Sequence, residues 1–340
     1  MENINITGFS KQLKYPSTRL LQAILTSRRS ILSHQSSKSP SKQSINQSKC
    51  DISIISLSKN QDLNVKSPTE TRKRYNSLVT IPHVTASSWC VMDCGSSHWI
   101  TGHNDSELRE IASLSKILTC LVCLKYLESN SRVNLDSKVK VSYKSSKVIG
   151  TSANLRVGDY LSLNSLLYGL MLPSGNDAAW ALAEYFGSKI SPNSVKPVKH
   201  FVHEMNKLIS ELHLVGSNFA NPHGLMYKRN LSCARDVGKL VCFAMKNKKF
   251  REIVDTKFYT AEIVGQDGLT RFQVWENTNK LLGNSFCGVK TGITDAAGPC
   301  LAVCSRTSNP IVVVLLNSRT MEERWIEAKK LLDWVNSRAF

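Results

Sequence analysis

Residues 111–119 read IASLSKILT, which places a serine and a lysine three positions apart where a long apolar helix begins. Side chains three apart on a helix share one face, so Ser113 and Lys116 are expected to lie side by side. A serine hydroxyl is a weak nucleophile until a base takes its proton. A lysine whose pKa is lowered by burial or by a cationic neighbour can act as that base. The stretch therefore predicts an activated serine.

The Ser-x-x-Lys pattern taken alone is not specific. It also occurs at residues 56–59 and 39–42, both in polar sequence with no apolar helix that could bury the lysine. Without other support, Lys116 would be interpreted as an ordinary solvated lysine on a helix surface. Two more segments, further along the chain, favour the catalytic interpretation.

The second segment is Ser174-Gly175-Asn176, in the break between Pro173 and a helix expected from residue 177. A loop held between two helices can direct a hydroxyl and an amide toward one point. Serine and asparagine are also common helix caps, and this alternative stays open for the segment taken alone.

The third segment, Lys290-Thr291-Gly292, ends a short stretch expected to be a strand. A cation, a hydroxyl and a residue without a side chain at a strand edge can bind an extended peptide that ends in a carboxylate. An ordinary strand end before a turn is the alternative. The three segments in this order, each in a suitable element, favour one active site assembled from distant parts of the chain.

With their flanking residues, these motifs resemble those of the serine D-alanyl-D-alanine carboxypeptidases, the low-molecular-mass penicillin-binding proteins. The resemblance covers roughly residues 80–340. It rests on residues 111–119, 170–179, 221–225, 232–236 and 288–298. It implies an α+β fold of the β-lactamase/transpeptidase type, in which an antiparallel sheet formed from both chain ends is flanked by helices and joined to a helical lobe.

The resemblance also implies catalytic roles. Ser113 attacks the peptide carbonyl and becomes acylated, with Lys116 as the base. Ser174 relays protons, and Asn176 orients Lys116 and the substrate. The backbone N–H groups of Ser113 and Ile293 form the oxyanion hole.

For substrate binding, the resemblance implies that Lys290 and Thr291 hold the terminal carboxylate of the peptide. Gly292 leaves room for the substrate backbone, and Ile293 follows it at the end of the strand. His223 is interpreted as structural, because a histidine beside a glycine turn often satisfies local hydrogen bonds. No metal and no cofactor are expected.

The expected function is hydrolysis of a C-terminal D-alanyl peptide bond, with β-lactams as inhibitors. Gly175 stands where class A β-lactamases have aspartate, and no convincing Glu-x-x-Leu-Asn segment is present, so a carboxypeptidase is preferred to a β-lactamase. A β-lactamase, an esterase or amidase, and an inactive module that binds cell-wall fragments remain open alternatives. The sequence after the last expected helix indicates neither the family's β-rich C-terminal domain nor its anchoring helix.

Residues 1–78 are expected to form a disordered, basic, Ser-rich extension preceding a catalytic domain at residues 79–340. Residues 1–75 carry 13 Lys and Arg against four acids, so they hold +9 of the chain's net charge of +18. Residues 33–48 contain almost no apolar side chain and cannot offset the entropy of folding. Residues 1–50 are rich in Arg and Ser and hold one acid, which indicates an organellar transit peptide; an untargeted extension is the alternative.

Partners and compartment follow from the same observations. The basic extension suits an anionic partner, yet nucleic acid is not expected to be that partner. No secretory signal is evident, and no apolar run is long enough to cross a membrane, so the chain is otherwise expected to be soluble and intracellular. Cys120 and Cys123 lie in an apolar helical stretch and are interpreted as small buried hydrophobic residues.

Hydrophobic periodicity predicts the elements of the catalytic domain. Ser232 is expected to cap the helix that starts at residue 235, and Gly187 is expected to end the helix that starts at residue 177. Strands are expected at residues 87–92, 97–102, 288–291, 300–305 and 310–317. Helices are expected at residues 112–129, 161–172, 177–186, 197–212, 235–246 and 321–338.

Overall fold

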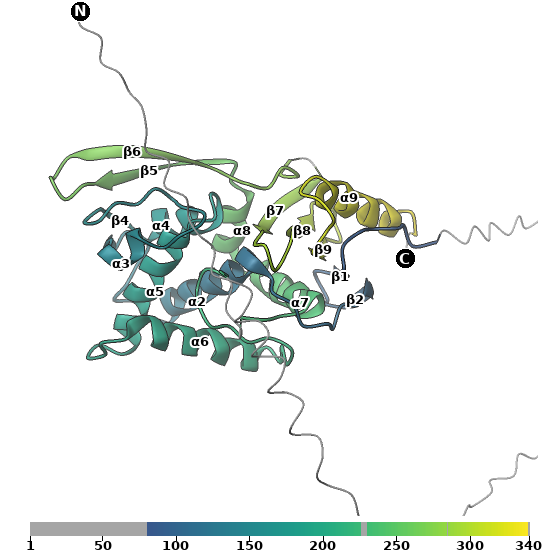
Figure 1. The fold of residues 1–340 in the computed structure, drawn as a ribbon, viewed down its shortest axis with the longest axis horizontal. Coiled ribbons are helices and arrows are strands. Elements are labelled where there is room, and N and C mark those ends of the chain that lie inside the picture. The colour runs from purple at the N-terminus through teal and green to yellow at the C-terminus, as the bar shows by residue number, and fades with distance from the viewer. Residues whose placement is uncertain (1–79, 226–229, 284, 339–340) are drawn as a thin grey trace, which may run out of the picture. The chain divides into compact units, whose positions relative to one another are not determined.

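The computed structural model describes residues 80–225, 230–283 and 285–338 (Figure 1). The expected disorder and transit peptide in residues 1–78 lie outside the described residues and stay predictions. The expected catalytic domain lies within the described part, apart from residues 79, 226–229, 284, 339 and 340.

The main sheet joins the two ends of the described chain. It has five antiparallel strands in the order β2-β1-β9-β8-β7. Strand β1 pairs with β9 from Ser88 opposite Leu316 to Asp93 opposite Ile311, which confirms the expectation of a sheet built from both ends. The strands are β1 (Ser88–Asp93), β2 (Trp99–His103), β7 (Phe286–Gly292), β8 (Cys300–Ser305) and β9 (Ile311–Leu316).

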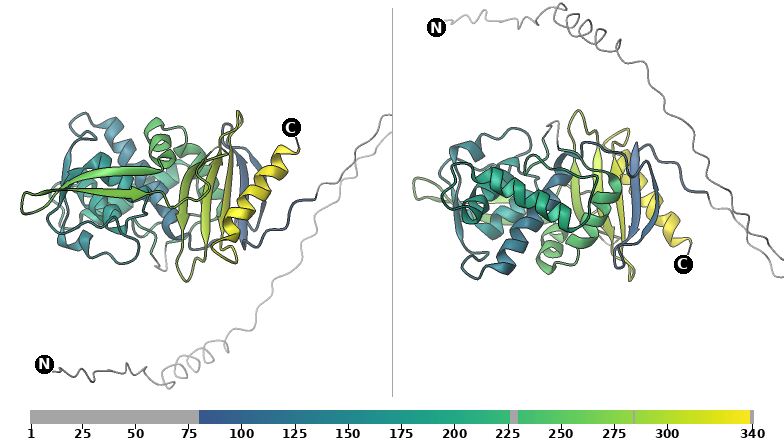
Figure 2. Two further views of the ribbon diagram at one scale, coloured as in Figure 1. Left: turned by 90° about the horizontal axis from the view of Figure 1, so that it is seen from above. Right: turned by 90° about the horizontal axis from the view of Figure 1, so that it is seen from below.

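Both faces of this sheet are covered, because side chains alternate along each strand. Val313 and Leu315 of β9 pack with helix α9 (Glu323–Asn336), which lies along the strands (Figure 2). Val312 and Val314 face the opposite way, into the core shared with α7 (Ala234–Ala244). All six residues of β8 and all six of β9 are therefore buried, in agreement with their continuous apolar sequence.

The helical lobe surrounds helix α2 (Ser115–Ser129), whose first ten residues are all buried. A helix that is buried all round occupies the centre of a core, and α2 packs against five other α-helices of the described part. Lys116 is one of these buried residues, so the helix carries a lysine into the interior. The remaining helices of the lobe are α3 (Tyr143–Ser146), α4 (Leu163–Met171), α5 (Asn176–Ile190), α6 (Pro197–Glu211) and α8 (Lys248–Asp255).

A second sheet, of four strands in the order β3-β4-β5-β6, was not expected from the sequence. Its long hairpin, β5 with β6, extends over the helical lobe (Figure 1). The strands are β3 (Lys138–Lys140), β4 (Tyr160–Ser162), β5 (Phe258–Val264) and β6 (Thr270–Glu276). Strands β3 and β4 are too short for their sequence to show the alternation of apolar and polar residues that marks a strand. In β6, the exposed positions include the apolar residues Phe272 and Val274, so the expected alternation is absent from its sequence.

Three local expectations were wrong. The segment expected to be helical from residue 161 begins as strand β4, and Ser162 then caps α4 by accepting from the N–H of Ser165. Helix α5 continues past Gly187 to Ile190. A Cβ at Gly187 would lie 2.0 Å from the carbonyl oxygen of Pro197, so this glycine allows α6 to approach instead of ending α5. Ser232 does not cap α7. Its backbone instead forms an isolated antiparallel β-bridge with the backbone of Arg109.

In the part of the chain that the structure describes, no helix has both the length and the apolar character needed to cross a membrane.

Candidate active site

The backbone around Ser113 is shaped by a short 3₁₀ helix, η1 (Ala112–Leu114), which precedes α2 and packs against β7. Ala112 has a φ of 48°, a left-handed conformation that costs a non-glycine residue about 1–3 kcal/mol. A Cβ at Gly292 of β7 would lie 3.1 Å from the backbone nitrogen of Ser113. The absence of that atom lets the strand end lie close against the turn that carries the serine.

Lys116 makes three short polar contacts although it is fully buried. Its Nζ lies 2.8 Å from Oγ of Ser113, 2.7 Å from Oδ1 of Asn176 and 2.8 Å from the carbonyl oxygen of His223. A neutral amine has two N–H donors and one lone pair. The amide and carbonyl oxygens can only accept, so they take both donors, and the lone pair is left for the proton of Ser113.

The surroundings of Lys116 favour this neutral form. Burial lowers the pKa of Lys116 well below its ordinary value, and the positive charge of Lys290 lowers it further. The carboxylate of Asp177 acts in the opposite direction, but it is the smallest of the three influences. Lys116 thus has both the position and the electrostatics of a general base.

The second motif surrounds the start of α5. Asn176 is the first residue of this helix, and its amide uses both ends: Oδ1 accepts from Lys116, and Nδ2 donates to the carbonyl oxygen of Ile149 over 2.7 Å. Ser174 has a φ of 64° and is buried, and its Oγ has no hydrogen-bond partner among the described residues. A buried hydroxyl without a partner costs about 1–3 kcal/mol, which makes Ser174 a candidate for contact with a bound substrate.

The third motif lies at the end of β7, beside η1. Lys290 and Thr291 are buried; Nζ of Lys290 donates to the carbonyl oxygen of Thr291, and Oγ1 of Thr291 lies 2.8 Å from Oγ1 of Thr278. Burial, with the nearby guanidinium of Arg324, lowers the pKa of Lys290 to about 7. Ile293 follows the strand and is 49% exposed.

The structure thus brings the three motifs together. Asn176 accepts a hydrogen bond from Lys116, β7 packs against the turn that carries Ser113, and the charge of Lys290 acts on Lys116. The individual catalytic and binding roles given above to these residues stay predictions.

Sequence reasoning missed the contribution of the segment from Asn221 to Gly224. The interpretation of His223 as structural overlooked its carbonyl oxygen, which accepts from Lys116. Its ring is stacked near Trp180, with centroids 6.0 Å apart, and burial together with the charge of Lys116 lowers the pKa of His223 to about 3. The signal available in the sequence was Gly224, whose φ of 85° forms the turn that presents this carbonyl.

Comparison with known proteins identifies the family of this chain. The sequence model of the family described as D-alanyl-D-alanine carboxypeptidase (peptidase S11) matches residues 75–320. The chain belongs to this family. Among curated relatives, the D-alanyl-D-alanine carboxypeptidase of Streptomyces sp. strain K15 is 34% identical over 75% of this chain and 89% of its own length. The carboxypeptidase DacF of Bacillus subtilis is 30% identical, and the match covers 69% of this chain and 58% of the length of DacF.

Solved structures also match this chain. The crystal structure of the Streptomyces K15 DD-transpeptidase has a TM-score of 0.70 and 35% identity, covering 75% of this chain and 98% of that one. DacD of Francisella tularensis has a TM-score of 0.68 at 23% identity, covering 76% of this chain and 72% of that one, and it supports the fold alone. The expected β-lactamase/transpeptidase-like α+β fold is confirmed by these matches.

Proposed function

We propose that this S11 family member is a serine DD-peptidase that cleaves a C-terminal D-alanyl peptide bond through an acyl-enzyme on Ser113. The observation that carries the proposal is the environment of Lys116, whose two donors are used by Asn176 and His223 while its Nζ lies 2.8 Å from Oγ of Ser113. The names of the relatives, which are D-alanyl-D-alanine carboxypeptidases, supply the substrate class.

In the proposed reaction, Oγ of Ser113 attacks the carbonyl carbon of the penultimate D-alanine, and its proton passes to Nζ of Lys116. The N–H groups of Ser113 and Ile293 stabilise the oxyanion. Collapse of the tetrahedral intermediate breaks the C–N bond; Ser174 donates its proton to the departing amine of D-alanine and takes up the proton held by Lys116, which is thereby neutral again. Water then attacks the ester by the same route and releases the shortened peptide.

The proposed substrate ends in a carboxylate, and Lys290 is the cation proposed to bind it. Thr291 would add a hydrogen bond from its hydroxyl. Because burial lowers the pKa of Lys290 to about 7, this cation loses its charge within the ordinary working range of pH. Carboxylate recognition by this site is therefore expected to depend on pH.

For a peptide ending in D-Ala-D-Ala, kcat/KM is expected to rise with pH on the acidic side as Lys116 loses its proton. It is expected to fall above about pH 7, where Lys290 becomes neutral in the free enzyme. The measurement is a pH profile of kcat/KM, compared with that of the same peptide ending in a carboxamide. The carboxamide is expected to be a poorer substrate with a weaker alkaline decline. Equal alkaline declines for the two peptides would remove Lys290 from carboxylate recognition.

The proposed activity is tested by incubating the full chain with a D-Ala-D-Ala peptide, with nitrocefin and with a fluorescent penicillin. Release of D-alanine, slow or absent turnover of nitrocefin, and a penicillin adduct mapped by mass spectrometry to the peptide that contains Ser113 are expected. Rapid nitrocefin turnover without release of D-alanine would instead establish a β-lactamase. Binding of the peptide without any turnover would indicate an inactive binding module.

Transpeptidation is a second candidate reaction, because the K15 protein that matches this chain at 35% identity is described as a DD-transpeptidase. The acyl-enzyme would then be resolved by an amine instead of by water. Addition of a D-amino acid to the same assay distinguishes the two reactions: an exchanged peptide product reports transfer, and the shortened peptide reports hydrolysis.

A further inference from the structure

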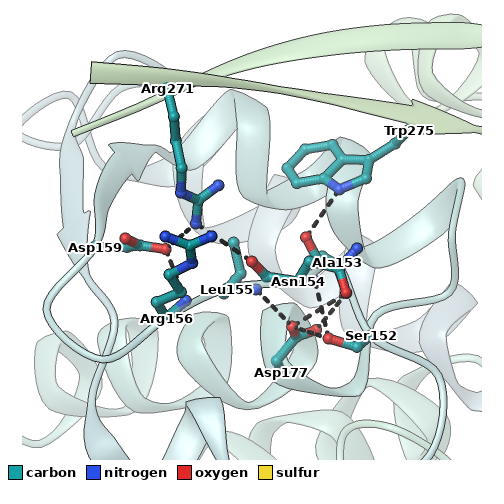
Figure 3. Close-up of polar contacts among 9 residues, drawn as sticks. All are labelled: Ser152, Ala153, Asn154, Leu155, Arg156, Asp159, Asp177, Arg271 and Trp275. Carbon is teal, nitrogen blue, oxygen red and sulfur yellow. Dashed lines mark hydrogen bonds and ion pairs between the residues drawn. The ribbon is translucent and has the colours of Figure 1, made fainter. Parts of the chain in front are cut away.

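A loop of eight residues beside the second motif, residues 149–156, is called the strap here. It lies between α3 and β4, and Asp177 of α5 binds its middle (Figure 3). The carboxylate of Asp177 accepts from Oγ of Ser152 at 2.6 Å and from the N–H groups of Ala153 at 2.8 Å and Leu155 at 3.1 Å. Asp177 is 1% exposed, so a buried carboxylate is satisfied by the strap.

The other side of the strap is held by the β5–β6 hairpin (Figure 3). The indole Nε1 of Trp275 donates to the carbonyl oxygen of Ala153 over 2.9 Å, and the guanidinium of Arg271 donates to that of Asn154 over 3.3 Å. Arg271 is also ion-paired with the buried Asp159. The strap is therefore fixed between α5 and a strand of the second sheet.

The first residues of the strap bind the second motif. The carbonyl oxygen of Ile149 accepts a hydrogen bond from Nδ2 of Asn176. The carbonyl oxygen of Thr151 accepts a second one, from the backbone N–H of Asn176, over 2.8 Å. The hydroxyl of Thr151 donates to the carbonyl oxygen of Ser174 over 2.6 Å. Gly150 has a φ of 92°, and a Cβ at this position would lie 2.7 Å from Nδ2 of Asn176. The lack of a side chain at Gly150 therefore lets the strap lie close to the amide of Asn176.

We propose that Asp177 is a positioning residue, which fixes the strap and thereby holds Ser174 and Asn176 at the active site. This inference rests on the proposed function, because it assigns a role in that reaction. Ser174 is kept at a positive φ by this arrangement, and Asn176 keeps its Oδ1 on Lys116. Displacement of such groups by about 1 Å is expected to cost roughly 100-fold in rate.

The charge of Asp177 provides a readout that a purely structural role would not change. The titratable groups that face Lys116 are Lys290 from β7, Asp177 from α5 and the imidazole of His223. Lys290 lowers the pKa of Lys116, and Asp177 raises it. His223 has a pKa of about 3 and is neutral over the working range. Removal of the Asp177 charge therefore lowers the pKa of Lys116, provided that Lys290 is unchanged.

The test is the pH dependence of acylation by a fluorescent penicillin in full-length Asp177→Asn protein. The maximal rate constant is expected to fall roughly 10- to 100-fold. The midpoint of the acidic limb is expected to move to lower pH, because acylation requires neutral Lys116. A midpoint that stays in place or moves to higher pH would overturn the inference. A wild-type protein that takes no label at all would instead refute the proposed function.

Asp159→Asn is the matched control, since Asp159 is equally buried, binds Arg271 and the N–H of Arg156, and is not among the charges that act on Lys116. Its acidic midpoint is expected to equal that of the wild type. The same midpoint shift in both variants would overturn the role of Asp177.

Thr151→Val tests the strap independently, including the case in which Asp177→Asn does not fold. It removes the donor to Ser174 and leaves the carboxylate in place. A rate lowered at least threefold, with an unchanged midpoint and a thermal unfolding temperature that confirms folding, is expected. A Thr151→Val rate equal to that of the wild type would show that the strap does not position Ser174, and would overturn the inference.

Discussion

Ser113→Ala protein is expected to take no covalent label from penicillin and to hydrolyse a D-Ala-D-Ala peptide roughly 10⁴-fold more slowly than the wild type, or slower still. The reason is geometric: Oγ of Ser113 lies 2.8 Å from Nζ of the buried Lys116. Without this hydroxyl there is no activated nucleophile at the site. Labelling on a denaturing gel and release of D-alanine measure the two effects.

Ser115→Ala is the matched control for this variant. Ser115 lies two residues further on in the same sequence motif, is fully buried, and donates through Oγ to the carbonyl oxygen of Ala112 over 2.9 Å. Its loss is expected to cost about 1 kcal/mol of stability and to leave the labelling of Ser113 in place. Labelling of the Ser113→Ala protein at another residue would show that the nucleophile lies elsewhere.

The sequence was most informative where burial is complete. Strands β8 and β9 are apolar without interruption because both of their faces are covered, and that pattern predicts interior strands. Strands at both ends of the domain predicted one sheet that joins the two ends, and the pairing of β1 with β9 confirms it. The meeting of the three motifs was predicted from the chemistry that they share, together with the family resemblance.

The parts that sequence reasoning missed depend on backbone atoms or on contacts between remote residues. A carbonyl oxygen such as that of His223 is present at every residue, so no residue type marks its use as an acceptor for Lys116. Gly187 looked like a helix end, yet its function is to admit the backbone of Pro197. Strands β3 and β4 have only three residues each, and they form a sheet only together with the neighbouring β5–β6 hairpin. Their own sequence therefore does not predict them.

The unusual backbone around the nucleophile leads to the second large effect, which is expected from Gly224→Ala. A Cβ at this position would lie 1.9 Å from the carbonyl oxygen of Ala112 and 3.0 Å from the nitrogen of Ser113. These are backbone atoms, so no side-chain rotation relieves the clash, and the turn must move away from the serine. Because His223 precedes this turn, its carbonyl oxygen would also move away from Lys116.

We expect Gly224→Ala to lower the rate constant for acylation by penicillin roughly 100-fold or more, since both the nucleophile and the base lose their alignment. An additional loss of about 1–3 kcal/mol in the free energy of unfolding is expected, because an alanine is forced to keep a φ of 85°. Acylation kinetics and urea unfolding measure the two quantities on the same preparation.

Gly268→Ala separates the clash from the backbone strain. Gly268 has a φ of 80°, close to that of Gly224, but lies in the turn between β5 and β6, where an added Cβ meets nothing within 4 Å. This variant is expected to lose a similar strain energy, about 1 kcal/mol, and to acylate at the wild-type rate. If Gly224→Ala also acylated at the wild-type rate, the close approach of this turn to Ser113 would have no part in catalysis, and the support of Lys116 by the carbonyl of His223 would have to be abandoned.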